Sequence, residues 1–244
     1  MKRFTFLLAV LAVAFQTPSF AQKAPDVDQI IDNYFEAIGG KENWKELHSM
    51  RFSGNSVNMG MTFPTEVISM RPNLQKVTAE FQNMQYVEAY DGTTAWMLNP
   101  FSGATEATKK TEEETKEAAK NNFEDELLDY KGKGHQLSLE GTEEVDGTST
   151  YKLKLTKADG DEVLYFFDTE AYVPLMIRTF AKTGPMEGQA VEIYFSDYDE
   201  VDGLMIAHSI EQKMNGQTIM QMTAEKIELN PEDIDASDFA YPKE

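Results

Sequence analysis

Five Asp-Gly or Asn-Gly dipeptides divide this chain, from residue 49 onward, into stretches in which apolar and polar residues alternate. Such dipeptides are typical of two-residue β-hairpins, because both central residues of a type I′ turn need a positive φ. Their repetition favours an antiparallel meander over parallel strands joined by helices. The five are Asp91-Gly92, Asp146-Gly147, Asp159-Gly160, Asp202-Gly203 and Asn215-Gly216.

The alternating stretches predict twelve strands. An antiparallel sheet of this size must curl or close. The run Val163–Phe167 is apolar on both faces, which indicates a sheet covered on both sides or a sheet with one side facing a cavity. We therefore predict a mainly β protein with helices. Its curled or closed sheet is expected to be wide enough to leave room for a ligand. The expected strands are 49–58, 62–70, 74–82, 84–90, 94–98, 135–143, 149–157, 162–167, 173–181, 189–197, 204–214 and 218–229.

Helices are expected at the N-terminal side of the meander and in its middle. Residues 26–38 place apolar side chains on one face at helical spacing, and Gly39-Gly40 can end that helix. Residues 41–47 predict a short second turn. Residues 108–129 are rich in charge and predict a partly helical insertion whose apolar edge is Phe123, Leu127 and Leu128.

The first 21 residues have the pattern of a secretory signal peptide. Lys2 and Arg3 precede an apolar stretch, and small residues precede Gln22, where we expect cleavage. The alternative, a membrane anchor, needs a longer apolar stretch to cross a hydrocarbon core of ~30 Å. The mature chain is therefore expected to be secreted and soluble. We expect residues 22–244 to form a single domain, because no Pro-, Gly- or Ser-rich linker divides them.

The charge balance restricts the partners of the chain. It contains 42 acidic and 22 basic residues, which gives a formal net charge of -20. A protein this acidic repels phosphate backbones and anionic head groups, so neither nucleic-acid binding nor electrostatic membrane adhesion is expected. The chain has no cysteine, which excludes disulfides, thiolate zinc sites and cysteine nucleophiles.

A search for reactive constellations finds none that is specific. His48, His135 and His208 are isolated from one another, and no HExxH or GxSxG motif is present. The acidic run 197–202 lacks the spacing of a calcium loop. We therefore expect no metal, no cofactor and no enzymatic activity, although a hydrolase that uses a pair of carboxylates stays open.

Methionine is frequent along the predicted sheet. Twelve methionines follow the signal peptide, and flexible thioethers suit surfaces that accept varied apolar shapes. Large apolar residues on the predicted strands are candidates for the wall of a cavity that binds such ligands. These candidates are Phe63, Met84, Tyr86, Ile193, Phe195 and Ile206.

One stretch of about thirty residues carries an ordered string of motifs. Arg71-Pro72-Asn73-Leu74 is followed by Asp91-Gly92, Trp96 and Asn99-Pro100-Phe101. This string resembles that of the LolA-like periplasmic carriers and their outer-membrane lipoprotein-sorting relatives. The sequence GGKENWKELHSM after the first predicted helix is similar to that of Bacteroidetes-type variants.

The resemblance implies an unclosed antiparallel β-barrel whose open side is plugged by helices. It also implies a periplasmic carrier that shields lipoprotein acyl chains, or another lipid, from water. Arg71 matches the family's arginine that bonds to backbone carbonyls of the helical lid and holds the closed state. Trp96 and Phe101 match aromatic residues near the cavity wall. The implied partners are lipid and an inner-membrane lipoprotein-releasing transporter, and we expect a monomer.

Two other functions remain open from the sequence. A sensor or regulatory module of the cell envelope can use the same half-barrel, although 223 residues leave little room for a second domain. A periplasmic hydrolase would need two acids that converge in a cleft, with the pKa of one of them raised.

Overall fold

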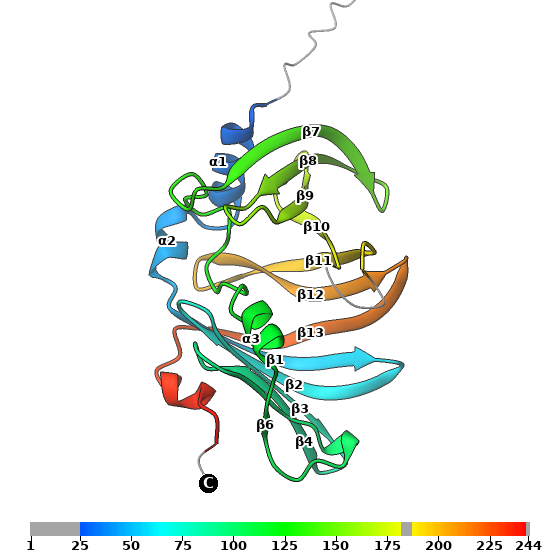
Figure 1. The fold of residues 1–244 in the computed structure, drawn as a ribbon. Coiled ribbons are helices and arrows are strands. Elements are labelled where there is room, and N and C mark those ends of the chain that lie inside the picture. Colours follow the sequence, from blue (N-terminus) through cyan, green and yellow to red (C-terminus); the bar gives the residue numbers. More distant parts are fainter. Residues whose placement is uncertain (1–24, 182–186, 243–244) are drawn as a thin grey trace, which may run out of the picture.

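The computed structural model describes residues 25–181 and 187–242. The predicted signal peptide, residues 1–21, lies outside the described residues. All thirteen strands of the described chain belong to one antiparallel sheet, with the order β6-β5-β4-β3-β2-β1-β13-β12-β11-β10-β9-β8-β7 (Figure 1). The sheet therefore consists of two meanders that meet where β1 pairs with β13.

The strands agree with the predicted stretches to within a few residues, apart from the short additional strand β6 and a longer β11. They are β1 (Ser49–Asn58), β2 (Met61–Met70), β3 (Leu74–Phe81), β4 (Met84–Tyr90), β5 (Ala95–Leu98), β6 (Thr108–Lys109), β7 (Gln136–Val145), β8 (Thr148–Thr156), β9 (Glu162–Asp168), β10 (Pro174–Phe180), β11 (Ala190–Val201), β12 (Leu204–Met214) and β13 (Gln217–Leu229).

Three of the five predicted dipeptides form tight turns with positive φ at both positions. These are Asp146-Gly147, Asp202-Gly203 and Asn215-Gly216. In Asp91-Gly92 only the glycine has positive φ, and the Asp91 carboxylate accepts hydrogen bonds from the backbone N–H groups of Thr93 and Thr94. Asp159-Gly160 likewise has positive φ only at the glycine. Two further turns, Met59-Gly60 and Gln82-Asn83, have positive φ at both positions and were not predicted from the sequence.

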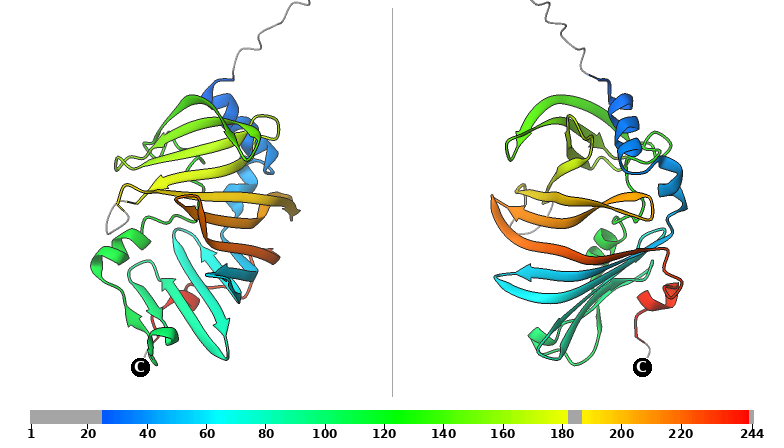
Figure 2. Two further views of the ribbon diagram at one scale, coloured as in Figure 1. Left: turned by 90° about the vertical axis from the view of Figure 1, so that its right-hand side faces the viewer. Right: turned by 180° about the vertical axis from the view of Figure 1, so that it is seen from behind.

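The sheet curls into a half-barrel (Figure 2). The half-barrel is open because its two edge strands, β6 and β7, do not pair with each other. Directly paired residues in antiparallel strands point to the same face. We call the face on which α1 (Val27–Ala37) packs the inner face. Following the register, it carries Leu153, Tyr165, Ile177, Ile193, Phe195, Ile210, Met222, Ser56, Phe63, Thr65, Ala79 and Tyr86.

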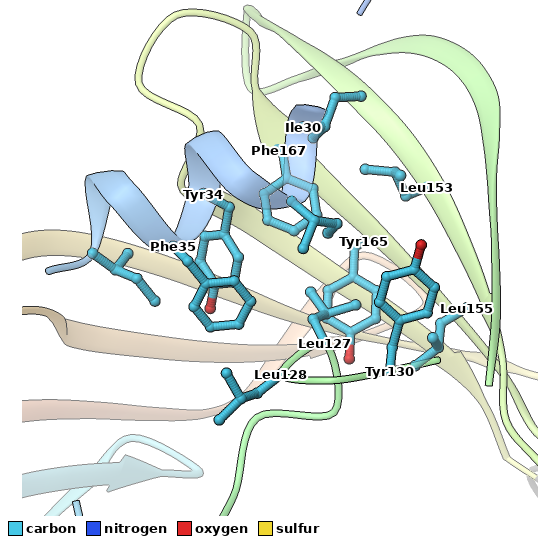
Figure 3. Packing of buried hydrophobic residues seen from close by; sticks show 12 residues of the cluster. Ile30, Tyr34, Phe35, Leu127, Leu128, Tyr130, Leu153, Leu155, Tyr165 and Phe167 are labelled. Carbon is cyan, nitrogen blue, oxygen red and sulfur yellow. The ribbon is translucent and has the colours of Figure 1, made fainter. Parts of the chain in front are cut away.

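The largest core cluster fixes α1 to one end of the inner face. The helix begins at Asp26, whose side chain accepts a hydrogen bond from the Gln29 backbone N–H. Its apolar face packs on β8 and β9 (Figure 3). The buried members are Ile30, Ile31, Tyr34, Phe35, Ile38, Leu127, Leu128, Tyr130, Leu153, Leu155, Tyr165 and Phe167. A second short helix, α2 (Lys41–Glu46), follows α1.

The middle of the chain is less helical than predicted. Only α3 (Glu112–Ala118) forms, with a capping box at Thr111 and Glu114. Residues 119–135, which we call the mid-chain segment, contain turns and no regular helix. Leu127 and Leu128 are nevertheless buried, because this segment packs on α1 and β8.

The C-terminal segment covers the opposite, outer face of the sheet near β2 to β5. The 3-10 helix η3 (Ala236–Phe239) places Phe239 against Ile68 and Leu74. Trp96 lies in a neighbouring cluster and donates a hydrogen bond from Nε1 to the Phe239 carbonyl at 2.9 Å. The chain itself therefore covers part of the outer face of β2 to β5.

Candidate functional site

An apolar pocket of about 510 Å³ lies on the inner face, at the ends of strands β1 to β4 and β13. Its volume is in the range of ordinary ligand pockets. Its lining consists of Ser56, Asn58, Met59, Met61, Phe63, Thr65, Val77, Ala79, Tyr86, Glu88, Phe101, Met220 and Met222. Four methionines and two phenylalanines thus supply much of the wall, and such side chains can adapt to different apolar shapes.

Three aromatic rings support one side of the pocket. Phe63 packs against Phe81 with ring centroids 5.4 Å apart, and Phe101 lies 6.4 Å from Phe63 and 6.1 Å from Phe81. Phe101 belongs to the 3-10 helix η1 (Pro100–Ser102), which the Asn99 side chain caps by accepting the Phe101 N–H. The cap holds a half-exposed ring over the pocket, so this ring can meet a ligand without a change of backbone.

A single ionised group lines the pocket, and it is neutralised locally. Glu88 forms an ion pair with Lys110 and accepts a hydrogen bond from the Tyr86 hydroxyl. Partial burial, together with the hydrogen bond and charge of Glu88, raises the pKa of Tyr86, so the phenol stays protonated at physiological pH. The polar end of the pocket therefore offers hydrogen-bonding groups without a net charge.

Arg71 lies at the other end of the half-barrel. It follows the last residue of β2, whereas the pocket includes the first, Met61. Ten residues of strand span roughly 30 Å. Arg71 donates from Nε to the Leu47 carbonyl at 2.7 Å and from Nη2 to the Trp44 carbonyl at 3.0 Å. Its guanidinium thus holds the C-terminal end of α2 and does not touch the pocket.

The same guanidinium also holds the mid-chain segment. Nη1 of Arg71 is ion-paired with Glu124, and Lys133 contacts the second carboxylate oxygen of Glu124 at 2.7 Å. Burial acts to raise the pKa of Glu124, but the hydrogen bonds from Lys133 and Arg71 outweigh it and the pKa is lowered. Arg71 therefore joins α2, the end of β2 and the mid-chain segment through an ionised partner.

A buried carboxyl group forms a second link between α1 and the mid-chain segment. The Tyr34 hydroxyl donates to Asp125 Oδ2 at 2.5 Å, and the Leu127 N–H donates to Asp125 Oδ1 at 2.8 Å. Burial is the largest influence on Asp125, and it raises the pKa of this group despite the two donors. Burial and the negative charge of Asp125 raise the pKa of Tyr34 as well.

The structure distributes the predicted cavity residues over several places. Phe63, Tyr86 and Phe101 line the pocket. Met84 is exposed at the start of β4, and Trp96 is a core residue on the outer face rather than a pocket residue. Ile193 and Phe195 lie on the inner face of β11, beyond β13 and β12, outside the pocket lining; Ile206 on β12 is also outside it.

Glu88, Val77 and Ala79 were not predicted from the sequence to be members of one site. The four methionines of the lining were among the twelve that the sequence offered as candidates for an adaptable apolar surface, but nothing in the sequence separated these four from the other eight. A stronger signal was available in the tight turn at Met59-Gly60, because a large apolar residue in such a turn is unusual.

The side chains of His135 and His208 have local partners. His135 Nε2 contacts Glu126 at 3.0 Å, and its Nδ1 accepts the Ala158 N–H at 3.1 Å. His208 Nδ1 lies 3.0 Å from the Ile206 carbonyl. Within residues 25–181 and 187–242, no group of three or more His, Cys, Asp or Glu side chains is arranged to hold a metal ion. The same residues include no helix that is both long and apolar enough to cross a membrane.

Comparison of the coordinates with solved structures identifies the architecture. A LolA superfamily protein from Nitrosomonas europaea aligns with a TM-score of 0.55 at 14% identity, over 89% of this chain and 98% of its own. The chain has a LolA-like fold. A predicted outer membrane lipoprotein-sorting protein domain from Vibrio parahaemolyticus aligns at 0.57 and 11% identity, over 86% of this chain and 94% of its own.

A DUF1329 family protein from Desulfovibrio piger is also similar in structure to this chain. It aligns with a TM-score of 0.59 at 12% identity, over 88% of this chain and 98% of its own. No protein-family profile matches the sequence, and no curated protein matches it. The likeness therefore lies in the fold, and the function has to be argued from the pocket.

Proposed function

We propose that this protein is a non-enzymatic carrier that binds lipid acyl chains in the pocket on its inner face. The observation that carries the proposal is the pocket itself: about 510 Å³, walled by methionine and phenylalanine, with a polar end that has no net charge. A long apolar tail fits such a wall, and an ester or amide group fits the polar end.

The binding energy available to such a ligand is sufficient. Each methylene group removed from water contributes about 0.8 kcal/mol. Ten buried methylenes correspond to about 8 kcal/mol, or micromolar affinity before the costs of association are subtracted. A hydrocarbon tail can therefore be held and still be released.

We further propose that the carrier acts in the periplasm and transfers lipoproteins toward the outer membrane. The predicted signal peptide and the LolA-like fold support this setting. A lipoprotein-releasing transporter of the inner membrane is the expected donor of cargo. In this proposal Arg71 acts as the lid latch, because it fastens α2 and the mid-chain segment to the end of β2.

Native mass spectrometry of residues 22–244 tests the proposal directly. Acyl-bearing molecules that co-purify at a defined stoichiometry would support a carrier. Displacement of the neutral probe N-phenylnaphthylamine by a diacyl lipid then measures the affinity. An empty protein that binds no probe and hydrolyses ester or glycoside substrates would contradict it.

Two variants with similar exposure locate the binding site. Phe101 lines the pocket and Phe180 does not, and their exposed fractions are 49% and 47%. Phe101→Ala is expected to weaken probe binding about tenfold, whereas Phe180→Ala leaves it unchanged. Ala79→Leu, which adds volume inside the pocket, is expected to weaken binding further. Equal effects of the two alanine variants would place the ligand elsewhere.

A further inference from the structure

The exposed large apolar side chains of this protein are gathered at one end of the strands. Among residues 25–181 and 187–242 there are six, and five of them lie in turns or strand ends around the pocket: Met59, Met61, Met84, Phe101 and Ile219. The sixth, Phe180, ends β10. Isolated exposed apolar residues are ordinary, but a group of them on one edge indicates an interaction surface.

The antiparallel topology explains why these residues meet. Three turns lie at the same end of the strands: β1–β2, β3–β4 and β12–β13 (Figure 1). The 3-10 helix η1 follows β5 at that end as well. We call residues 58–62, 81–85, 98–104 and 214–220 the apolar rim. The rim borders the pocket, because Met59, Met61 and Phe101 are both exposed and part of the pocket lining.

The apolar rim contains no Asp, Glu, Lys or Arg. Charged residues make up 26% of the chain, and the net charge is -20. The opposite strand ends carry Arg71, Asp91 and Asp202. The four rim segments are therefore uncharged in an otherwise acidic chain, whereas the β8–β9 turn, at the same ends of the strands, carries Lys157, Asp159 and Asp161.

The shape of the rim suits a soft, uncharged surface. Met59 is 93% exposed at the tip of a two-residue turn, Met84 begins β4 after another turn, and Phe101 belongs to η1. Side chains on separate tips can each enter the interfacial layer of a bilayer, where apolar groups are accommodated beside polar backbone. The lack of basic residues excludes attraction to anionic head groups, and the acidic body is repelled by them.

We propose that the apolar rim docks on the surface of a zwitterionic lipid bilayer. Docked in this way, the mouth of the pocket faces the acyl layer, and a lipid tail can enter or leave without crossing water. The docking itself does not require an occupied pocket. It goes beyond the proposed carrier function by specifying where the chain contacts a membrane and with which residues.

Tryptophan reporters test the docking. Phe101→Trp places an indole on the rim, and Thr93→Trp places one in the exposed turn at the other end of β4 and β5. With phosphatidylcholine vesicles, we expect a blue shift and quenching by brominated lipid for Phe101→Trp and neither for Thr93→Trp, relative to the wild-type signal of Trp44 and Trp96. No shift for Phe101→Trp, or equal shifts for both variants, would overturn the proposal.

Charge insertion gives an independent readout. In vesicle co-sedimentation, the double variant Met59→Glu/Met84→Glu is expected to bind phosphatidylcholine at least tenfold more weakly, and Thr93→Glu to bind as the wild type does. Binding of the wild type to phosphatidylglycerol vesicles is expected to be weaker and to improve with salt, because salt screens the acidic body. The wild type can instead form a dimer that does not bind vesicles, while the double variant is a monomer. This result would show that the rim contacts a second copy and would overturn the proposal.

The two proposals can fail separately. Probe binding is measured in solution without vesicles, and vesicle docking is measured without probe. Vesicle binding without any probe binding would leave the docking intact and contradict the carrier function. Probe binding without vesicle binding would support the carrier function and contradict the docking.

Discussion

Arg71 and Glu124 form an ion pair that joins the end of β2 to the mid-chain segment. The two residues are 53 positions apart. The four strands β3 to β6 and the helix α3 lie between them in the sequence. Arg71 also holds two carbonyls at the end of α2. One side chain therefore connects three parts of the structure that no strand pairing connects.

Replacing Arg71 by leucine is expected to loosen these parts. The variant loses two charge-assisted hydrogen bonds and an ion pair, so the free energy of unfolding should fall by about 2–4 kcal/mol in urea denaturation. Hydrogen exchange should rise in residues 119–135 and in α2, while β1 to β4 stay protected. Glu124→Gln keeps the carbonyl contacts and is expected to cost less than about 1 kcal/mol. Equal losses for the two variants would mean that the carbonyl bonds contribute nothing.

The Tyr34–Asp125 pair predicts a pH dependence of stability. Burial raises the pKa of Asp125 above its ordinary 3.8, so the folded chain binds this proton more tightly than the unfolded chain does. The stabilisation is complete below pH 3.8 and is lost as the pH rises through the folded pKa. Compared with Asp125→Asn, the wild type should therefore lose stability as the pH rises from 4. A stability difference between the two proteins that stays constant over this range would contradict the assignment.

Tyr34→Phe supplies the control for that pair. It removes one of the two donors to Asp125, so the carboxylate is buried with a single partner. We expect a loss of about 1–3 kcal/mol that becomes smaller as the pH falls, because a protonated carboxyl needs the donor less than a carboxylate does. Thermal unfolding over a series of pH values measures the difference.

Glu88→Gln is expected to change the ligand preference of the pocket. The substitution leaves Lys110 without its carboxylate partner, and a cation beside an apolar wall favours a fatty-acid carboxylate. A charge-assisted hydrogen bond contributes roughly 1.5–3 kcal/mol, so oleate should bind about tenfold more tightly. The affinity for the neutral probe should change little. A parallel gain for oleate and the probe would indicate a change of pocket shape instead.

Met59→Asn is expected to stabilise the fold and weaken its membrane contact. Met59 has a φ of 49° in the β1–β2 turn, a conformation that asparagine adopts more readily than other side chains. The free energy of unfolding should rise by about 0.5 kcal/mol. Binding to phosphatidylcholine vesicles should fall in the same variant. A gain in both properties would separate this methionine from the docking surface.

Much of the fold follows from local sequence patterns. Strand β1, for example, was predicted with its correct bounds because the alternation of period two begins directly after the helical spacing of the preceding residues. The turns Asp202-Gly203 and Asn215-Gly216 fixed the register of three consecutive strands. Helix α1 was equally clear, since its apolar face is continuous.

The site was harder to predict, because it depends on which strands become neighbours. Trp96 was expected in the cavity, yet the pairing of Ala89 with Trp96 places it on the outer face under the C-terminal segment. The pocket wall combines β13 with β1, which are more than 150 residues apart in the chain. Alternation indicates that a strand has two different faces, but it does not say which face meets a distant helix or a ligand.

The unpaired edges at β6 and β7 have a consequence for selectivity. A closed barrel has a diameter set by its strand number and stagger, whereas an open sheet can flatten or tighten its curvature while every existing ladder is retained. A bulkier occupant can then be admitted by small torsional adjustments shared among many residues. Discrimination by ligand size should accordingly be gradual, with affinity that declines smoothly along a homologous series instead of stopping at one chain length.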